Sequence, residues 1–268
     1  MEAVRQIFEG EPDFRWKRHV VGSGSLEATG STLHLVLSDA NAKGYSNAQI
    51  DDYQGLPRRR FLWYPPLKLT VQARFSAPAQ QLQGTAGFGF WNDPFLMTGK
   101  RLPAFPRAVW FFYASPASNM KLDLQVSGHG WKGATIDSLH PAALVWATLA
   151  PIAVPLMNLR PVYRALWPAI QQDLKVSETA IEVDMTHWHT YVIEWDIARA
   201  RFCIAGRESA SSPSILLDAP APKGPLGFVM WMDNQYLVAT PWGRLGWGLL
   251  DVPGRQSMEV AQIAIEPL

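Results

Sequence analysis

The sequence lacks an excess of charge of either sign, and it contains a single cysteine. Its 268 residues include 24 basic and 23 acidic side chains. A chain with such a balance has no long-range attraction for nucleic acid, so we expect no nucleic-acid partner. Cys203 has no second cysteine to pair with, which excludes an internal disulfide. The first residues lack the basic-then-apolar layout of a secretory signal, and we therefore expect a reducing, cytoplasmic location.

Helical periodicity is nearly absent before residue 138. Short alternating segments, separated by Gly, Pro, Ser and Asn, occur there instead, and this pattern is typical of half-buried strands. The predicted strands cover residues 31–37, 67–75, 85–91, 108–113, 121–126, 189–195, 201–204, 227–233 and 259–266. The sequence contains no alternation of strands with helices and no internal repeat. We therefore predict an all-β fold, an antiparallel β-sandwich of the jelly-roll type formed by residues 1–268 as a single domain.

Residues 138–178 interrupt this pattern. No residue from Ser138 to Leu159 carries a formal charge, and most are apolar. Pro141, Pro151 and Pro155 break the run, and the strands on both sides must join one sheet system, which excludes a membrane span. We predict a mostly helical hydrophobic insertion at about 138–178. It either buries its own core or forms a lid, with Trp146 against a lipophilic molecule, that gives the protein a peripheral membrane contact.

A family resemblance is carried by two adjacent predicted strands. Residues 189–195 (HTYVIEW) and 201–207 (RFCIAGR) resemble the F-H-T-Y-x-I-E-W and F-Y-V-D-G strands of family 16 glycoside hydrolases, such as laminarinases. Residues 84–91 resemble the strand that carries P-A-F-W in that family, and residues 258–265 resemble its closing strand. With the insertion set aside, the resemblance covers most of the chain. It implies a concanavalin A-like sandwich, and it implies the fold better than the function.

The resemblance fails at the catalytic strand. Family 16 enzymes carry E-[IL]-D-x-x-E there, because a retaining mechanism needs two carboxyl groups about 5–5.5 Å apart. The corresponding residues 106–113 (PRAVWFFY) contain no carboxylate. Ala108, Trp110 and Phe112 take the outward positions, and Asp123 in the next segment has no acidic partner. The protein is therefore not expected to be a retaining glycosidase, and the floor of its concave face is expected to be aromatic.

Three residues remain as candidate acids or bases. Asp233 ends a predicted strand on which Trp231 faces outward, and an acid among aromatic rings is expected to have a raised pKa. The alternative is that Asp233 and Asn234 begin a turn. Asp93, which precedes a proline, presents the same choice between site and turn. His129 lies in a glycine-rich loop that either bends tightly or approaches a ligand.

These residues lead to two functional hypotheses. In the first, the protein binds a hydrophobic small molecule, such as a terpenoid, polyketide or lipid, and isomerises or cyclises it with proton transfer from Asp233, Asp93 or His129. The predicted ligand contacts are Trp91, Trp110, Phe112, Trp131, Trp146, Trp231, Asn234 and Tyr236. In the second, the protein is a non-catalytic carbohydrate-binding module or a divergent glycoside hydrolase-like protein, in which sugars stack on the faces of Trp91, Trp131, Trp231, Trp242 and Trp247. No cofactor is expected, and no metal, because His187 and His189 have no third ligand at a recognisable spacing.

Overall fold

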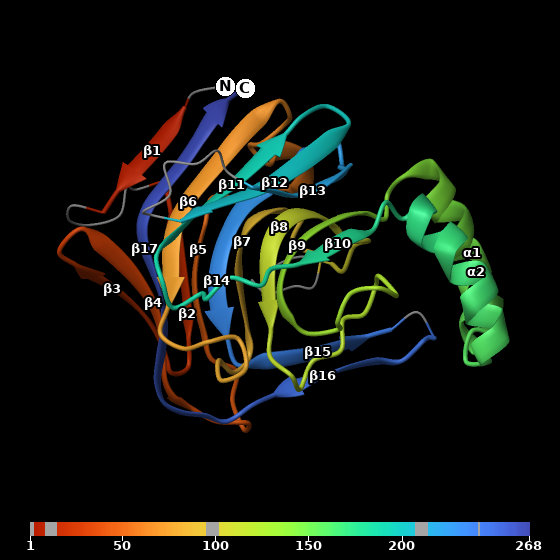
Figure 1. Cartoon of the computed structure of the whole chain (residues 1–268), viewed down its shortest axis with the longest axis horizontal. Coiled ribbons are helices and arrows are strands. Elements are labelled where there is room, and N and C mark those ends of the chain that lie inside the picture. The colour runs from red at the N-terminus through yellow and green to blue at the C-terminus, as the bar shows by residue number, and fades with distance from the viewer. Residues whose placement is uncertain (1–2, 9–14, 95–101, 207–213, 241) are drawn as a thin grey trace.

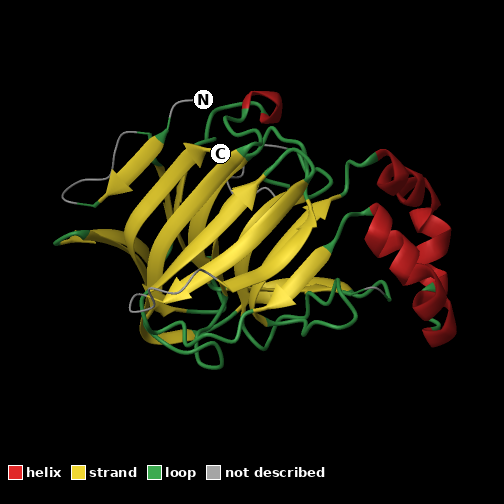
Figure 2. Cartoon of the chain, turned by 45° about the horizontal axis from the view of Figure 1, so that its top comes forward, coloured by secondary structure: helices red, strands yellow, loops and turns green. Residues whose placement is uncertain are grey.

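The computed structural model describes residues 3–8, 15–94, 102–206, 214–240 and 242–268. Two antiparallel sheets pack face to face, as expected for a sandwich (Figures 1 and 2). Sheet A has the order β13 (Ser214–Pro220), β12 (Arg199–Gly206), β11 (His189–Trp195), β6 (Leu67–Phe75), β17 (Val252–Pro267), β4 (Thr32–Ala40) and β3 (Gly24–Thr29), and β1 (Val4–Ile7) pairs with β17. Sheet B has the order β10 (Ser177–Ala180), β9 (Gly130–Asp137), β8 (Arg107–Ala114), β7 (Thr85–Trp91), β14 (Gly227–Asp233), β5 (Asn47–Asp51) and β2 (Lys17–Val21). A separate hairpin joins β15 (Gln235–Ala239) to β16 (Leu245–Leu249).

Side-chain alternation determines which residues enter the core between the sheets. In β6, every second residue from Leu67 to Phe75 is buried in that core, and the residues between them are partly exposed. In β7, β8 and β14 nearly all residues are buried, because other segments cover the outer face of sheet B, the face turned away from sheet A. These strands therefore read as continuous apolar runs.

Most of the predicted strands are confirmed, and four of them have the predicted bounds: β6, β7, β11 and β14. The prediction of a strand over residues 121–126 is wrong, because this segment is irregular. Its two leucines, Leu122 and Leu124, pack against the helices of the insertion, and the indole N–H of Trp167 donates a hydrogen bond of 2.8 Å to the carbonyl of Leu122. The alternation of this segment thus reflects docking onto helices rather than pairing in a sheet.

The insertion consists of two helices, α1 (Pro141–Leu156) and α2 (Arg160–Asp173), which pack side by side at one end of the sandwich (Figure 1). It is shorter than predicted, because Ser177 and Glu178 already belong to β10, which pairs with β9. Pro141 opens α1 at a position where a missing N–H costs nothing. Within the described residues, no helix is long and apolar enough to cross a membrane.

Candidate functional site

Four aromatic rings lie together on the outer face of sheet B. Trp91 comes from β7, Trp110 and Phe112 from β8, and Trp231 from β14. Trp91 and Trp231 are stacked with ring centroids 6.1 Å apart, and the ring of Trp110 lies 5.3 Å from Phe112 and 5.5 Å from Trp231. The sequence predicts Trp110, Phe112 and Trp231 on one outward face, and the structure brings them together there. We call these four residues the aromatic layer.

Glycines of β7 make room for the aromatic layer. Gly87 and Gly89 point to the outer face, while Phe88 and Phe90 between them enter the core. A Cβ atom on Gly87 would lie 2.9 Å from the Trp231 ring, and one on Gly89 would lie 2.6 Å from the Trp110 backbone. The Gly-Phe-Gly-Phe sequence of this strand is therefore required by the flat packing of indoles on its outer side.

The aromatic layer is closed. Each of its four rings is at most 8% exposed. The space above the rings measures about 30 Å³, and Met120 and Leu237 help to cover it. The expectation of an open, aromatic-lined cleft is therefore not met in this structure, where the rings form a packed apolar layer.

A larger pocket, which we call the β15 pocket, lies beyond Met120 and Leu237. Its volume is about 480 Å³, within the usual range for small-molecule sites. Its described lining residues are Pro94, Pro103, Met120, Gln235, Leu237, Val238, Ala239, Leu245, Gly246 and Trp247. In this set, Gln235 and the indole N–H of Trp247 are the only polar side-chain groups. The sequence did not predict this pocket, although Trp247 belongs to the tryptophans expected to stack on sugars in the second hypothesis.

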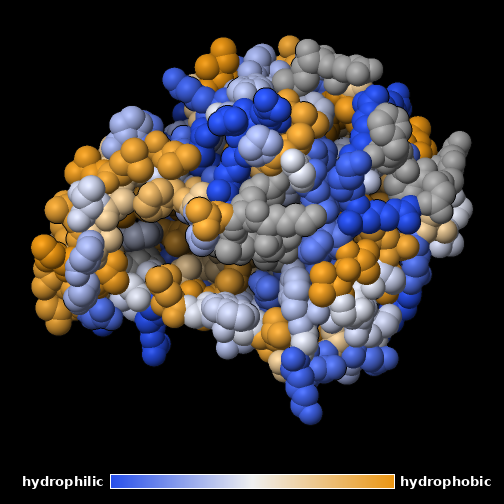
Figure 3. Space-filling view, turned by 180° about the vertical axis from the view of Figure 1, so that it is seen from behind, coloured by the Kyte–Doolittle hydropathy of each residue, from blue (hydrophilic) through white to orange (hydrophobic). Residues whose placement is uncertain are grey.

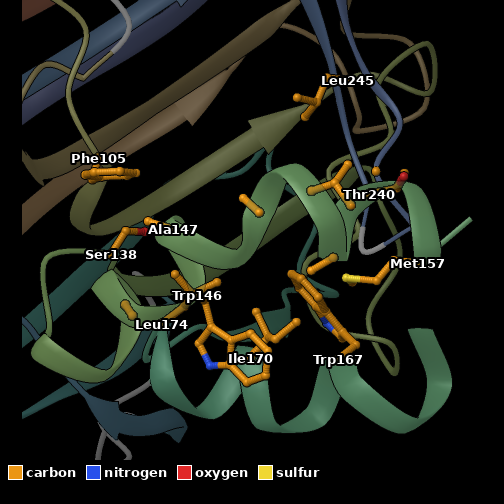
Figure 4. A pocket seen from close by; sticks show the side chains of 15 residues that line it. Phe105, Ser138, Trp146, Ala147, Met157, Trp167, Ile170, Leu174, Thr240 and Leu245 are labelled. Atoms are coloured by element: carbon orange, nitrogen blue, oxygen red, sulfur yellow. The ribbon is translucent and has the colours of Figure 1, made fainter. Parts of the chain in front are cut away.

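A second apolar pocket of about 240 Å³ is lined by the helices and by the β15–β16 hairpin (Figure 4). Trp146, Met157, Trp167 and Ile170 line it from the helices, and Leu245 lines it from β16. Trp146 is a predicted ligand contact, and its ring does face this pocket, while its Nε1 donates a hydrogen bond of 2.7 Å to Asp173. Leu245 also lines the β15 pocket, so the two pockets are neighbours.

Asp233 is buried beneath the β15 pocket. Its Oδ1 accepts hydrogen bonds from the Thr85 hydroxyl at 2.8 Å, the Thr85 N–H at 3.3 Å and the Gln235 N–H at 3.0 Å. Burial raises the pKa of Asp233 to about 6, and these hydrogen bonds offset part of the effect. The raised pKa agrees with the expectation from sequence. The hydrogen bond from the Gln235 N–H, two residues further on, is typical of a turn that begins at Asp233. The sequence offered such a turn as the alternative to a role in a binding site.

The three candidate acids and bases do not come together. Thr85 pairs with Asp233 at one end of β7, whereas Asp93 follows Trp91 at the other end. The strand between them has seven residues, which corresponds to about 20 Å. His129 is exposed and precedes β9, three strands from β14. An acid–base pair built from these residues is therefore not assembled in this structure.

The remaining candidates have other environments. Asn234 is buried, and its side-chain amide donates to the carbonyls of Asn41, Gly44 and Leu250 while its oxygen accepts from the Ser46 N–H, so it ties loops together. Tyr236 is partly exposed and packs over Gly248 of the neighbouring strand. Trp131 lies in the core between the sheets, where it stacks with Phe111. The expectation that Trp131 faces the cleft is wrong, because β9 turns this side chain inward.

The carboxylates of Asp51 and Asp233, on the outer face of sheet B, are too far apart for glycoside hydrolysis. Asp51 pairs in register with Val229, four residues before Asp233, so the two acids are about 13 Å apart along the strands. Retaining and inverting mechanisms need about 5–5.5 Å and about 6.5–9.5 Å. Glu178, on β10, forms an ion pair with Lys132. The spacing of Asp51 and Asp233 therefore fits neither mechanism.

Asp233 should make stability depend on pH. Its pKa of about 6 in the folded protein exceeds the usual 3.8, so the folded state holds the proton more tightly. The free energy of unfolding should then fall as pH rises from about 4 to about 6, by about 3 kcal/mol. Asp233→Asn keeps an oxygen for Thr85 and Gln235, so it should lose this part of the fall. Urea unfolding at pH 4 and pH 7.5 measures the difference, and an unchanged pH dependence would contradict the assignment.

Comparison with known proteins shows the fold. No family model and no curated protein sequence matches the chain. Rv0315 of Mycobacterium tuberculosis, described as an immunostimulatory antigen and pseudo beta-1,3-glucanase, is similar in structure, with 11% identity, a TM-score of 0.53 and coverage of 99% of this chain and 98% of that one. The exoplasmic/lumenal domain of VIP36, bound to Ca²⁺ and Man2, has 9% identity and a TM-score of 0.52, with coverage of 99% of this chain and 87% of that one. An uncharacterised protein of Mycobacterium paratuberculosis has 14% identity and a TM-score of 0.50, with coverage of 98% of this chain and 99% of that one. The chain therefore has a concanavalin A-like jelly-roll fold that resembles family 16-like proteins.

Proposed function

We propose that this protein binds a lipophilic small molecule in the β15 pocket without hydrolysing glycosidic bonds. The observation that carries the proposal is the composition of the pocket wall, in which nearly every described side chain is apolar. An apolar wall offers few hydrogen bonds to the hydroxyl groups of a sugar, so burying a sugar there is unfavourable. Burying an apolar molecule against the same wall is favourable, because apolar surface leaves water. Gln235 supplies one polar group that orients such a ligand.

The proposal contains no isomerisation or cyclisation. Asp93 and His129 are not among the described residues of the pocket wall. Asp233 lies in the small space below Leu237, where Thr85 and Gln235 already occupy one of its oxygens. A proton donor must come within hydrogen-bond reach of the reacting atom. The geometry therefore supports binding and offers no support for turnover.

A pocket-filling variant tests the proposal. Ala239 lines the pocket, and Ala239→Phe should lower affinity for the neutral fluorophore N-phenyl-1-naphthylamine at least tenfold, because the ring occupies the ligand's volume. Ala28→Phe, at an exposed position of β3 in sheet A, is the matched control and should bind as the unmodified protein does. Fluorescence titration, with dodecanol as competitor, measures both. Equal affinities for the two variants, or no binding by the unmodified protein, would refute the proposal.

Glycan binding is the second candidate, and the comparisons favour it. The VIP36 structure is described as bound to Man2, and Rv0315 is described as a pseudo-glucanase. In this chain, Trp247 is 70% exposed at the pocket and offers a ring face on which a sugar could stack. Isothermal calorimetry with laminari-oligosaccharides and mannobiose distinguishes the candidates. Binding of either sugar that Trp247→Ala abolishes, together with failure to bind the fluorophore, would establish the glycan candidate.

A further inference from the structure

We propose that the uncovered side of α1 docks on the surface of an anionic lipid bilayer. The docking surface consists of Leu144, Val145, Leu149, Ile152 and Leu156, and we call it the apolar rim. This inference goes beyond the proposed function and does not depend on it, because docking requires no ligand in either pocket.

The first argument is the composition of α1. The helix contains no charged residue, and apolar side chains surround its whole circumference. One side packs against α2, where Met157, Trp167 and Ile170 form a small core with Trp146. The other side is uncovered, and Ile152 is 69% exposed. A helix that is apolar on all sides is usually buried in protein or in a membrane, so the uncovered side indicates a missing apolar environment.

The β15–β16 hairpin adds exposed apolar side chains next to α1. A Cβ atom on Gly243, at the tip of the β15–β16 hairpin, would lie 2.8 Å from Val154 of α1, so the hairpin and the helix are in close contact there. Leu245, which follows, is 81% exposed, and Trp247 is 70% exposed. Figure 3 shows apolar side chains over the helical region and a hollow between this region and the body of the protein. Exposed tryptophan is favoured at the interface between a bilayer and water.

The elements packed against α1 carry exposed arginines. Arg160 and Arg164 of α2 and Arg244 of the β15–β16 hairpin are exposed, and none forms an ion pair with a residue that the structure describes. The acid nearest in sequence to Arg160 and Arg164, Asp173, accepts a hydrogen bond from Trp146, and the acid nearest to Arg244, Asp251, accepts the N–H of Ala42. Cationic side chains beside an apolar surface complement anionic headgroups. The net charge of +1 gives no long-range attraction, so the contact must be local.

These charges favour a bilayer over a second copy of the chain. In a two-fold dimer built on the apolar rim, each copy would bring the same three arginines to the interface without a compensating acid from this region. The length of α1 excludes a span, because 16 residues rise about 24 Å and the hydrocarbon core is about 30 Å thick. An α1 helix that lies parallel to the bilayer surface needs neither a second copy of the chain nor a helix long enough to span the membrane.

Vesicle sedimentation tests the proposal. The protein should bind vesicles of phosphatidylglycerol and phosphatidylcholine, and bind vesicles of phosphatidylcholine alone more weakly. Ile152→Asp should lower partitioning at least tenfold, because the carboxylate must leave water. Ile197→Asp is the matched control, since Ile197 is 60% exposed on the turn between β11 and β12 and lies outside the rim. Replacing Arg160, Arg164 and Arg244 with Gln should weaken binding to the anionic vesicles about fivefold per charge, or about 1 kcal/mol each.

The possible results distinguish a lipid bilayer from a second copy of the chain as the partner of the apolar rim. Loss of binding in Ile152→Asp but not in Ile197→Asp supports a bilayer contact through the rim. Absence of vesicle binding, or equal binding by both variants, overturns it. Light scattering without lipid provides the remaining comparison: a dimer that Ile152→Asp dissociates, in a protein that binds no vesicles, overturns the bilayer in favour of a second copy. Binding of N-phenyl-1-naphthylamine in lipid-free solution is measured separately, so failure of the pocket proposal is distinguishable from failure of this one.

Discussion

A Gly89→Ala variant should lose about 3 kcal/mol or more of its free energy of unfolding. Gly89 has a φ of 149°, which L residues rarely adopt. A Cβ atom there would also lie 2.5 Å from the carbonyl oxygen of Val109 and 2.6 Å from the Cα of Trp110. Both atoms belong to the backbone of β8, which is paired on both sides and cannot move without disturbing its partners. The clash therefore acts on the centre of sheet B and on the aromatic layer above it.

Gly246→Ala is the control for this experiment. Gly246 is exposed in β16. Among the described residues, the only atom near the position of an added Cβ is the Cβ of Val238 at 3.7 Å, which is an ordinary van der Waals distance. This variant should change the free energy of unfolding by less than about 0.5 kcal/mol. Urea denaturation at constant pH measures both proteins. Similar stabilities for the two variants would show that β7 and β8 are not packed as closely as the structure indicates.

The faces of the central strands could be predicted from the sequence. Period-two alternation in residues 67–75 determines which side chains of β6 enter the core, because a shift of one residue would reverse every side chain. The same rule places Ala108, Trp110 and Phe112 outward on β8 and Trp231 outward on β14. The strand pattern therefore places the residues that the resemblance aligns with the family's catalytic carboxylates on a particular face of the sandwich.

The closure of that face could not be predicted. Met120, which helps to cover the aromatic layer, follows β8 closely in sequence, but Leu237, which covers it from the other side, belongs to a distant segment, so the cover depends on long-range packing. The bridge between Asn119 and Val238 holds these two segments together, and no local pattern encodes it. The sequences of β7, β8 and β14 are therefore compatible with both an open aromatic cleft and a closed aromatic layer, and they do not distinguish the two.

Strand β9 shows why glycine-rich segments mislead sequence analysis. The sequence from Gly128 to Gly133 has turn composition, which predicts a loop at His129 and Trp131. In the structure, Trp131 pairs with Tyr113 of β8 and fills the core, and Gly133 accommodates the ring of Phe202. The glycine at 133 is thus present to make room for a core side chain, and local propensity gives no indication of that role.

A Lys132→Met variant should lose about 3–5 kcal/mol of its free energy of unfolding. Lys132 lies on the outer face of sheet B with its side chain 1% exposed, and its Nζ is 3.4 Å from the Glu178 carboxylate and 3.2 Å from the Met120 carbonyl. Burial lowers the pKa of Lys132 and raises the pKa of Glu178, and each charge offsets that effect in the other. Removing the cation leaves Glu178 buried and unpaired, in a place where it also accepts the N–H of Asp123.

The double variant Lys132→Met, Glu178→Leu should recover most of this loss, because neither charge then remains in the interior. Arg255→Met is the comparison at the surface. Arg255 pairs with Glu27 at 2.8 Å, but the two side chains are half exposed, so the cost should be below about 1 kcal/mol. A urea-denaturation cycle over these proteins measures the coupling. A loss in Lys132→Met as small as that in Arg255→Met would mean that water reaches the pair in solution. The segments that carry Met120 and Glu178, one over the aromatic layer and one leading from the helices into β10, would then be less tightly held than the structure indicates.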